Sequence, residues 1–237
     1  MTEIQADTAQ ETLFLQTVAQ ALGREKALTE PPDRQEVGPP SFWREQQFEA
    51  GQALALFKAN LEALTGKVAI VNNGTEATNQ LRLWLKLLNA RSAVLWDHPE
   101  LRRYVDVSRL EVKTTFWNND SARSELVSAA EQAEVGITWV HYAIGYTGTL
   151  ALFNGSGTGR SVSLLPATHI AVLRAGNIVP TMSTVMRHLI DRRGQGSLPS
   201  AVDFITGPSR TSDIEMDLSI GVHGPFRVWA VVIDDAP

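Results

Sequence analysis

The clearest chemical pattern in the sequence is the run ITGPSRTSDIE at residues 205–215. A strand expected at residues 202–206 ends there in small residues, and Ser212 and Glu215 have the spacing of a helix capping box. The start of a helix exposes backbone N–H groups at the positive end of its dipole, and a nearby glycine allows close approach. The pattern therefore predicts an anion site in which Arg210 is the charged clamp.

The same run also has a purely structural interpretation. Asp213, Glu215 and Asp217 already place negative charge in the first turn of the expected helix, where they complement its dipole. A self-capped helix that binds nothing would show the same pattern. Both interpretations stay open at this stage.

Two glycine-containing runs are further candidates for ligand binding. GYTGT at residues 145–149 lies between two expected strands, and its threonines and glycines suit a ligand or a plain hairpin turn equally well. GSGTGR at residues 155–160 is similar to a dinucleotide-binding loop, but residues 161–165 have a strand pattern where the pyrophosphate-binding helix should begin. We therefore interpret it as a connector in which only Arg160 is a candidate ligand contact.

The histidines show no metal-binding spacing, because none belongs to an HExxH pattern or a similar close motif. His169 begins an apolar expected strand and His223 precedes the last one, so either could be a general acid or base. A structural role is the favoured interpretation for both. No Ser-His-Asp order and no paired carboxylates are legible, so the residues alone define no catalytic set and no metal site.

Charge and composition exclude several functional classes. The 237 residues have a net charge of −5, and residues 1–50 account for it with nine acids against four bases, which leaves no basic stripe for nucleic acid. Residues 135–190 contain no carboxylate, which favours an anionic partner or, more simply, buried central strands. Because the chain has no cysteine, it cannot hold a disulfide or a cysteine-ligated iron–sulfur cluster.

No membrane span or secretion signal is expected. The first 20 residues carry acids and lack the apolar core of a signal peptide. The longest uncharged run, residues 135–159, contains six glycines, which is typical of strands and turns and not of a lipid-embedded helix. A cytoplasmic location fits these features and the absence of cysteine.

The periodicity predicts an α/β fold preceded by an arm. Residues 1–41 form a helix and a proline-rich linker, and residues 42–237 form a single domain. Alternating strand and helix patterns over residues 68–133 predict a mostly parallel sheet with helices on both faces. Later strands are expected at residues 137–144, 149–153, 162–165, 169–174, 202–206 and 226–233, with helices at 180–191 and from Asp213 onward.

Taken together, motifs of the second half resemble the lactate-utilisation protein C family, the LUD-domain proteins. These are SLLP at 163–166, THIAV at 168–172, IVP at 178–180, ITGPSRTSDIE at 205–215 and LSIGVHGP at 218–225, in the family's order and spacing. The resemblance is strong over about residues 135–233. It rests on pattern alone in the preceding region and hardly includes the arm.

The resemblance implies a fold like that of ribose-phosphate isomerases, glucosamine-phosphate isomerases, CoA transferases and formyltetrahydrofolate cyclo-ligases. It implies a part in oxidising L-lactate to pyruvate with iron–sulfur partner proteins, which must hold any cluster. The implied ligand-binding positions are Thr147, Gly148, Gly207, Ser209, Arg210, Thr211 and Asp213, and the catalytic candidates are His169, Glu215 and His223. Tyr146 stands where the family usually has an acidic residue, so no carboxylate role is expected at that turn.

Two functional hypotheses follow. In the first, the chain is an accessory component of L-lactate oxidation that binds a small carboxylate or phosphate-bearing ligand and has no cofactor of its own. In the second, it is an autonomous enzyme for a phosphorylated or nucleotide-activated substrate, by analogy with the isomerases and cyclo-ligases. The sequence does not decide between these two hypotheses. It also leaves open whether copies of the chain assemble and whether residues 5–24 dock a partner.

Overall fold

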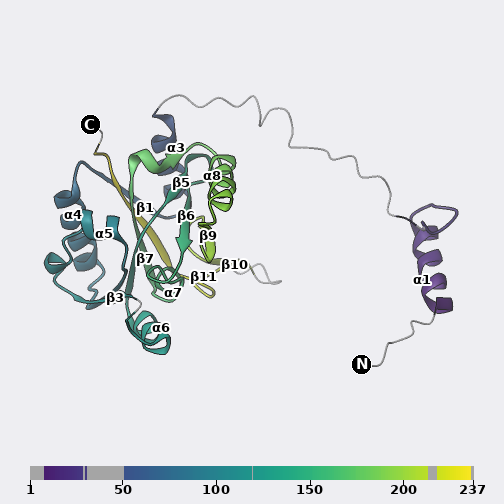
Figure 1. The fold of residues 1–237 in the computed structure, drawn as a ribbon, viewed down its shortest axis with the longest axis horizontal. Helices are drawn as coiled ribbons and strands as arrows, with labels where there is room; N and C mark the ends of the chain where they lie inside the picture. The colour runs from purple at the N-terminus through teal and green to yellow at the C-terminus, as the bar shows by residue number, and fades with distance from the viewer. Residues whose placement is uncertain (1–7, 29, 31–50, 119, 213–217, 236–237) are drawn as a thin grey trace. The chain divides into compact units, whose positions relative to one another are not determined.

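The computed structural model describes residues 8–28, 30, 51–118, 120–212 and 218–235, and Figure 1 shows the elements they form. Two compact units, residues 1–47 and 48–237, are considered separately. The first contains helix α1 (Thr8–Ala21). The boundary expected between residues 41 and 42 lies outside the described residues. None of the described helices is both long and apolar enough to cross a membrane.

The second unit is built on a six-stranded sheet in which every strand pairing is parallel. In spatial order the strands are β1 (Lys67–Val71), β12 (Arg227–Ile233), β7 (Thr168–Arg174), β4 (Val135–Trp139), β2 (Ser92–Trp96) and β3 (Lys113–Trp117). The inner strands are apolar and buried almost throughout because both faces of the sheet are covered. The predicted mostly parallel α/β sheet is confirmed.

Helices cover the two faces of this sheet. On one face lie α4 (Gly74–Leu87) and α5 (Pro99–Tyr104), where Trp84 packs edge-on against Trp229 with ring centroids 5.1 Å apart. On the other lie α6 (Arg123–Gln132) and α7 (Ser161–Leu164). Gly136 of β4 permits the close approach of α7, because a Cβ at this position would lie 1.8 Å from the carbonyl oxygen of Val162.

A second, four-stranded sheet continues from the carboxyl end of β4. Its order is β8 (Ile178–Val179), β5 (Tyr142–Ile144), β6 (Thr149–Asn154) and β9 (Ala201–Ile205). Helix α3 (Gln52–Ala63) packs on the 3-10 turn η2 (Gly145–Thr147) between β5 and β6, and Asn60 Nδ2 donates to the carbonyls of Gly145 and Tyr146, both at 2.9 Å. Helix α8 (Met182–Gly194) packs on this sheet through Val185.

Two of the expected strands are wrong. The strand expected at residues 137–144 is divided between the two sheets, because after β4 the N–H of His141 donates to the carbonyl of Ala151 in β6. The strand expected at residues 162–165 is the helical turn α7, closed by hydrogen bonds such as that from the N–H of Val162 to the carbonyl of Gly159. The short alternation of polar and apolar residues in this segment is compatible with both a strand and a helical turn.

The helix expected from Asp213 begins outside the described residues. Residues 210–212 form strand β10 (Arg210–Ser212), which pairs antiparallel with β11 (Leu218–Ile220). Ser212 is therefore opposite Leu218 in a ladder. Residues 213–217 lie outside the described residues.

We expect Gly136→Ala to destabilise the domain by about 3 kcal/mol or more, because the new methyl group collides with a backbone carbonyl that cannot rotate away. Gly176→Ala is the matched control, since no atom lies within 4 Å of its Cβ position. Urea unfolding of both variants measures the difference. Equal stabilities would contradict the close packing of α7 on β4.

Candidate functional site

The carboxyl ends of the parallel strands form one edge of the six-stranded sheet, and a topological switch point lies in the middle of this edge. From β2 the chain moves outward to β3, whereas from β4 it moves in the opposite direction to β7. Such a reversal opens a crevice between the ends of the two neighbouring strands, which is where open α/β sheets bind ligands. The residues that follow β2 and β4 are therefore the first to consider.

A pair of histidines lies at this switch point. His98 is the second residue after β2 and His141 is the second after β4, and their rings meet edge to face with centroids 5.2 Å apart. The ring of His98 is nearly parallel to that of Trp139 at 6.0 Å, and the ring of His141 is nearly parallel to that of Phe153 at 4.7 Å. The histidine pair is thus held between aromatic side chains.

Backbone hydrogen bonds fix the position of the proton on each ring. Nδ1 of His98 accepts the N–H of Glu100 at 3.2 Å and thereby caps α5, and Nδ1 of His141 accepts the N–H of Phe153 at 3.3 Å. Because an accepting Nδ1 bears no proton, each uncharged ring carries its proton on Nε2. Within the described residues neither Nε2 forms a hydrogen bond.

The surroundings keep both rings uncharged near neutral pH. Burial lowers the pKa of His141 to about 3, and positive charge on His98, Arg192 and His188 acts in the same direction. Burial also lowers the pKa of His98, against a smaller opposing effect of the Glu100 carboxylate. The pair therefore offers two N–H donors without a charge.

A second polar cluster lies at the same edge. The hydroxyl of Tyr104 donates to Oδ2 of Asp235 at 2.5 Å, and Nε of Arg174 donates to Oδ1 of Asp235 at 2.9 Å. The bond from Tyr104, followed by that from Arg174, lowers the pKa of Asp235 despite partial burial. Because the Tyr104 ring also stacks on Trp139 at 5.6 Å, this cluster joins the end of α5 to the ends of β7 and β12.

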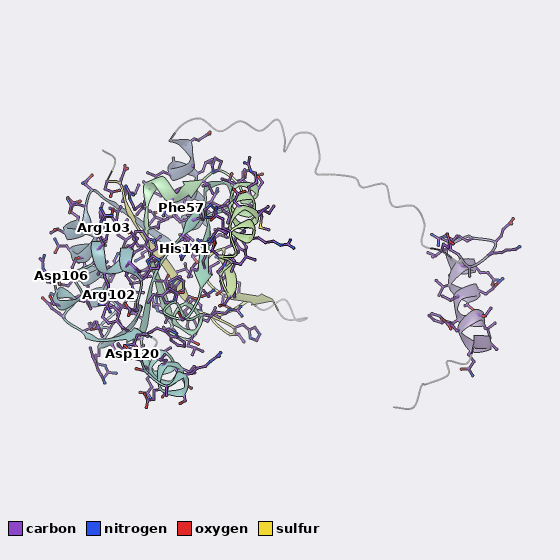
Figure 2. The ribbon with its side chains drawn as sticks, in the orientation of Figure 1. Phe57, Arg102, Arg103, Asp106, Asp120 and His141 are labelled. Carbon is purple, nitrogen blue, oxygen red and sulfur yellow. The ribbon has the colours of Figure 1, made fainter. Side chains whose placement is uncertain are left out.

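An open cavity of about 620 Å³ adjoins this cluster at the start of α4 and the end of α5. Figure 2 shows Arg102, Arg103 and Asp106 on this side of the domain, with His141 nearer the second sheet. The polar side chains and small residues that line the cavity are Asn73, Gly74, Thr75, Thr78, Arg102, Arg103, Tyr104, Asp106 and Arg109. The lining thus contains three arginines and one aspartate.

The three arginines differ in how far they are engaged by the protein. Arg102 donates to Asp97 at 2.5 Å and Arg103 lies 3.8 Å from Glu100. Arg109 donates from Nη2 to the amide oxygen of Asn79 at 3.2 Å, and it has no carboxylate partner within the described residues. Arg109 is therefore the least neutralised cation of the cavity.

A comparison with known protein families shows to which family this chain belongs. The profile of the LUD domain matches residues 54–233. The chain belongs to the LUD domain family. The resemblance found in the sequence motifs is thereby confirmed.

Proteins named "Lactate utilization protein C" are similar to this LUD-domain chain. That of Shouchella clausii is 35% identical over 230 residues, covering 94% of this chain and 96% of the relative. That of Geobacillus sp. (strain WCH70) is 34% identical over 237 residues, covering 94% and 95%. That of Halalkalibacterium halodurans is 40% identical over 153 residues, covering 64% and 66%.

A solved structure supports the fold of the LUD domain. It is the crystal structure of a DUF162 family protein from Deinococcus radiodurans, which matches with a TM-score of 0.56 at 21% identity and covers 79% of this chain and 99% of the other. At this identity the likeness shows the fold alone. The α/β class predicted from the sequence is confirmed.

The loop predicted to bind an anion is engaged by other parts of the LUD domain. Nη2 of Arg210 donates to the carbonyl of Leu64 at 2.8 Å and to Oγ1 of Thr65 at 3.2 Å, beyond the end of α3. The N–H of Ser209 donates to the carbonyl of Pro225 at 3.1 Å, and Gly207 adopts a positive φ of 78° beside Leu64. Ligand binding by Gly207, Ser209, Arg210 and Thr211 stays a prediction. Asp213 and Glu215 lie outside the described residues.

The run at residues 145–149 forms a hairpin turn between β5 and β6. Gly148 has a φ of 64°, and a Cβ there would lie 2.6 Å from the backbone nitrogen of Leu61, so glycine is needed for the turn to meet α3. The hydroxyl of Thr147 bonds to that of Thr149 at 2.6 Å. A ligand role for Thr147 and Gly148 stays a prediction.

The two histidines singled out from the sequence lie apart from the switch point. His169 is fully buried as the second residue of β7, at the amino end of the sheet, and its Nε2 bonds to Oγ1 of Thr138 at 2.8 Å. This burial agrees with its structural interpretation. His223 is exposed in the loop before β12, where its N–H donates to Oγ of Ser209 at 3.3 Å.

The sequence analysis did not single out His98, His141 or the cavity arginines. His98 had a usable signal, because it follows an expected parallel strand and precedes a proline that begins a helix. His141 had none, because it lay inside a single expected strand. Arg160, the one candidate of the glycine-rich run, lies 2.8 Å from Asp203 and forms an ion pair with it.

We expect His169 to make the stability of the domain depend on pH. Burial lowers its pKa from 6.5 to about 3, so the unfolded chain binds more protons than the folded one below pH 6.5. The free energy of unfolding therefore decreases as the pH is lowered below 6.5, at a slope that approaches about 1.4 kcal/mol per pH unit. Urea unfolding between about pH 6.5 and pH 5 measures this slope.

His169→Gln should make that slope shallower by about the same amount, although the substitution itself lowers stability at every pH. The comparison of slopes separates the loss of a titrating group from the loss of packing. An identical slope in the variant would mean that the His169 pKa is not lowered by folding.

Proposed function

We propose that this chain acts in lactate utilisation and that it binds a small anionic ligand in the arginine-lined cavity. The names of its relatives support the first part, and three arginines around one cavity at the carboxyl edge of the sheet support the second. Lactate and pyruvate are small carboxylates, and the planar guanidinium group binds carboxylates through two parallel hydrogen bonds.

Arg109 is the residue on which this proposal depends most. Arg102 and Arg103 each have a carboxylate partner, so an added anion has to compete with Asp97 or Glu100 there. Arg109 has one bond to a neutral amide, which leaves most of its N–H donors for a ligand. The observation that carries the proposal is this incompletely neutralised guanidinium in a cavity wall.

The start of α4 adds a smaller attraction. Asn73 caps this helix by accepting the N–H of Glu76 at 2.9 Å, and Gly74 and Thr75 of its first turn line the cavity. The positive end of the helix dipole therefore faces the same space. The carboxylate of Glu76 accepts hydrogen bonds at the same helix end and offsets part of this field, which leaves the arginines as the main attraction.

The redox part of lactate utilisation requires a partner. Oxidation of L-lactate to pyruvate releases an electron pair, and this chain has no cysteine with which to ligate an iron–sulfur cluster. We therefore assign electron acceptance to iron–sulfur partner proteins and ligand binding to this chain.

Arg109→Gln should weaken the binding of sodium L-lactate or inorganic phosphate by about 1.5–3 kcal/mol, the range for a hydrogen bond to a charged group. Titration calorimetry of the full chain measures the affinity. Arg227→Gln removes the same charge at the amino end of β12 and should leave the affinity unchanged. If Arg210→Gln abolishes binding while Arg109→Gln does not, the anion binds in the loop of residues 207–211 and the cavity proposal is wrong.

Catalysis by the chain alone, on a phosphorylated or nucleotide-activated substrate, is a second candidate function. It is favoured by the histidine pair at the switch point, whose Nε2 atoms form no hydrogen bond with the residues that the structure describes. The accessory function predicts no turnover of sugar phosphates or ATP by the purified chain, and lactate oxidation only after iron–sulfur partners are added. Turnover by the chain alone that is lost in His98→Asn would establish the second function instead.

A further inference from the structure

We propose that His98 and His141 form a two-donor site for the carbonyl oxygen of a small molecule, of which a 2-oxo acid is the class that fits best. This inference rests on the proposed function for the choice of a 2-oxo acid, because pyruvate belongs to that class. The site itself is separate from the arginine-lined cavity, because neither histidine lines that cavity.

The first argument is the supply of unused donors. Both rings direct Nδ1 to a backbone N–H, which leaves Nε2–H as the donor of each ring. The ring centroids are 5.2 Å apart and the ring planes are inclined by 85°. Two half-buried rings in contact, each with a donor that forms no hydrogen bond within the described part of the chain, call for a solvent or ligand acceptor, since an unpaired buried donor is costly.

The second argument is rigidity. Each ring is held by one backbone hydrogen bond and one nearly parallel aromatic neighbour, Trp139 for His98 and Phe153 for His141. Trp139 and Phe153 are themselves buried in the two sheets. Donors fixed in this way need little rearrangement when an acceptor binds, which is the property that makes such groups effective toward an oxygen that gains negative charge.

The third argument is the absence of charge at the pair, which selects the kind of oxygen. Uncharged donors hold a polarised carbonyl oxygen well, whereas a phosphate or isolated carboxylate is better served by cations. The carboxylate of Glu100 is close enough to influence the His98 ring, and the guanidinium of Arg192 lies over the Phe153 ring at 5.6 Å. A carbonyl oxygen, with two lone pairs in one plane, matches two N–H donors.

Side-chain nitrogen NMR of the ¹⁵N-labelled full chain tests the proposal without any variant. Sodium pyruvate should shift the Nε2–H signals of both His98 and His141, whereas sodium acetate and inorganic phosphate should leave them in place. His169 is the internal control, because its Nε2 is already bonded to Thr138. Equal shifts with acetate or phosphate would overturn the assignment to a carbonyl, and an absence of shifts with pyruvate would overturn the site.

A variant series tests the donors individually. Asn in place of His98 or His141 retains an acceptor near the Nδ1 position, and at residue 98 also the helix cap, but lacks the Nε2 donor. Each substitution should weaken pyruvate binding about tenfold or more, while His98→Gln, which restores a distal N–H, should recover part of the affinity. Thermal unfolding confirms that each variant is folded. Folded Asn variants that bind pyruvate with unchanged affinity would refute the proposal.

This proposal and that of the cavity fail independently. Arg109→Gln should weaken phosphate binding and leave the pyruvate-induced shifts of the two histidines in place. Conversely, the Asn variants should leave phosphate binding unchanged. A loss of both properties in Arg109→Gln would mean that one ligand needs both places, and would overturn the separation of the two sites.

Discussion

The burial of β4 between two parallel neighbours is the constraint on which the rest of the domain depends. Its five residues are buried, and it pairs with β2 on one side and β7 on the other. Both edges of β4 are occupied by parallel neighbours, and beyond its end the chain leaves the six-stranded sheet. There the N–H of His141 donates to the carbonyl of Ala151 in β6, so the chain continues in the second sheet. The place where β4 ends thus determines where His141 lies and where the two sheets meet.

The same constraint produces the distribution of charge along the carboxyl edge. Large flat side chains fill the space where the sheets meet, and their packing removes water from the histidines and lowers the pKa of both rings. Charged groups lie farther along α5, where the guanidinium of Arg102 stacks on the ring of Phe116 and stays partly accessible to solvent. The edge is therefore uncharged at its middle and cationic on the α4 and α5 side, so it offers two different environments within one crevice.

The parts of the fold that the sequence predicts well are those determined by long buried runs. The strand expected at residues 169–174 is β7 at Thr168–Arg174, because continuous burial leaves an unambiguous apolar signal. Short local signals are ambiguous: residues 161–164 become helix because they pack on Gly136, and residues 210–212 become strand because they pair with residues 218–220. The site is harder still, since the switch point depends on the spatial order of strands, which no local pattern contains.

Charge counting along the sequence fails for a related reason. Arg160 and Arg174 lie in a stretch without carboxylates, yet both are paired, with Asp203 and Asp235 from later in the chain. Arg109 lies between two acids in the sequence and is paired with neither.

Those two acids are engaged by other groups. Asp106 accepts the N–H and hydroxyl of Ser108, and Glu111 forms an ion pair with Arg82. An anion responds to the charge that remains after pairing in space, which among the cavity arginines is greatest at Arg109. The location of the proposed anion site is thus a property of tertiary contacts, even though every charge involved is visible in the sequence.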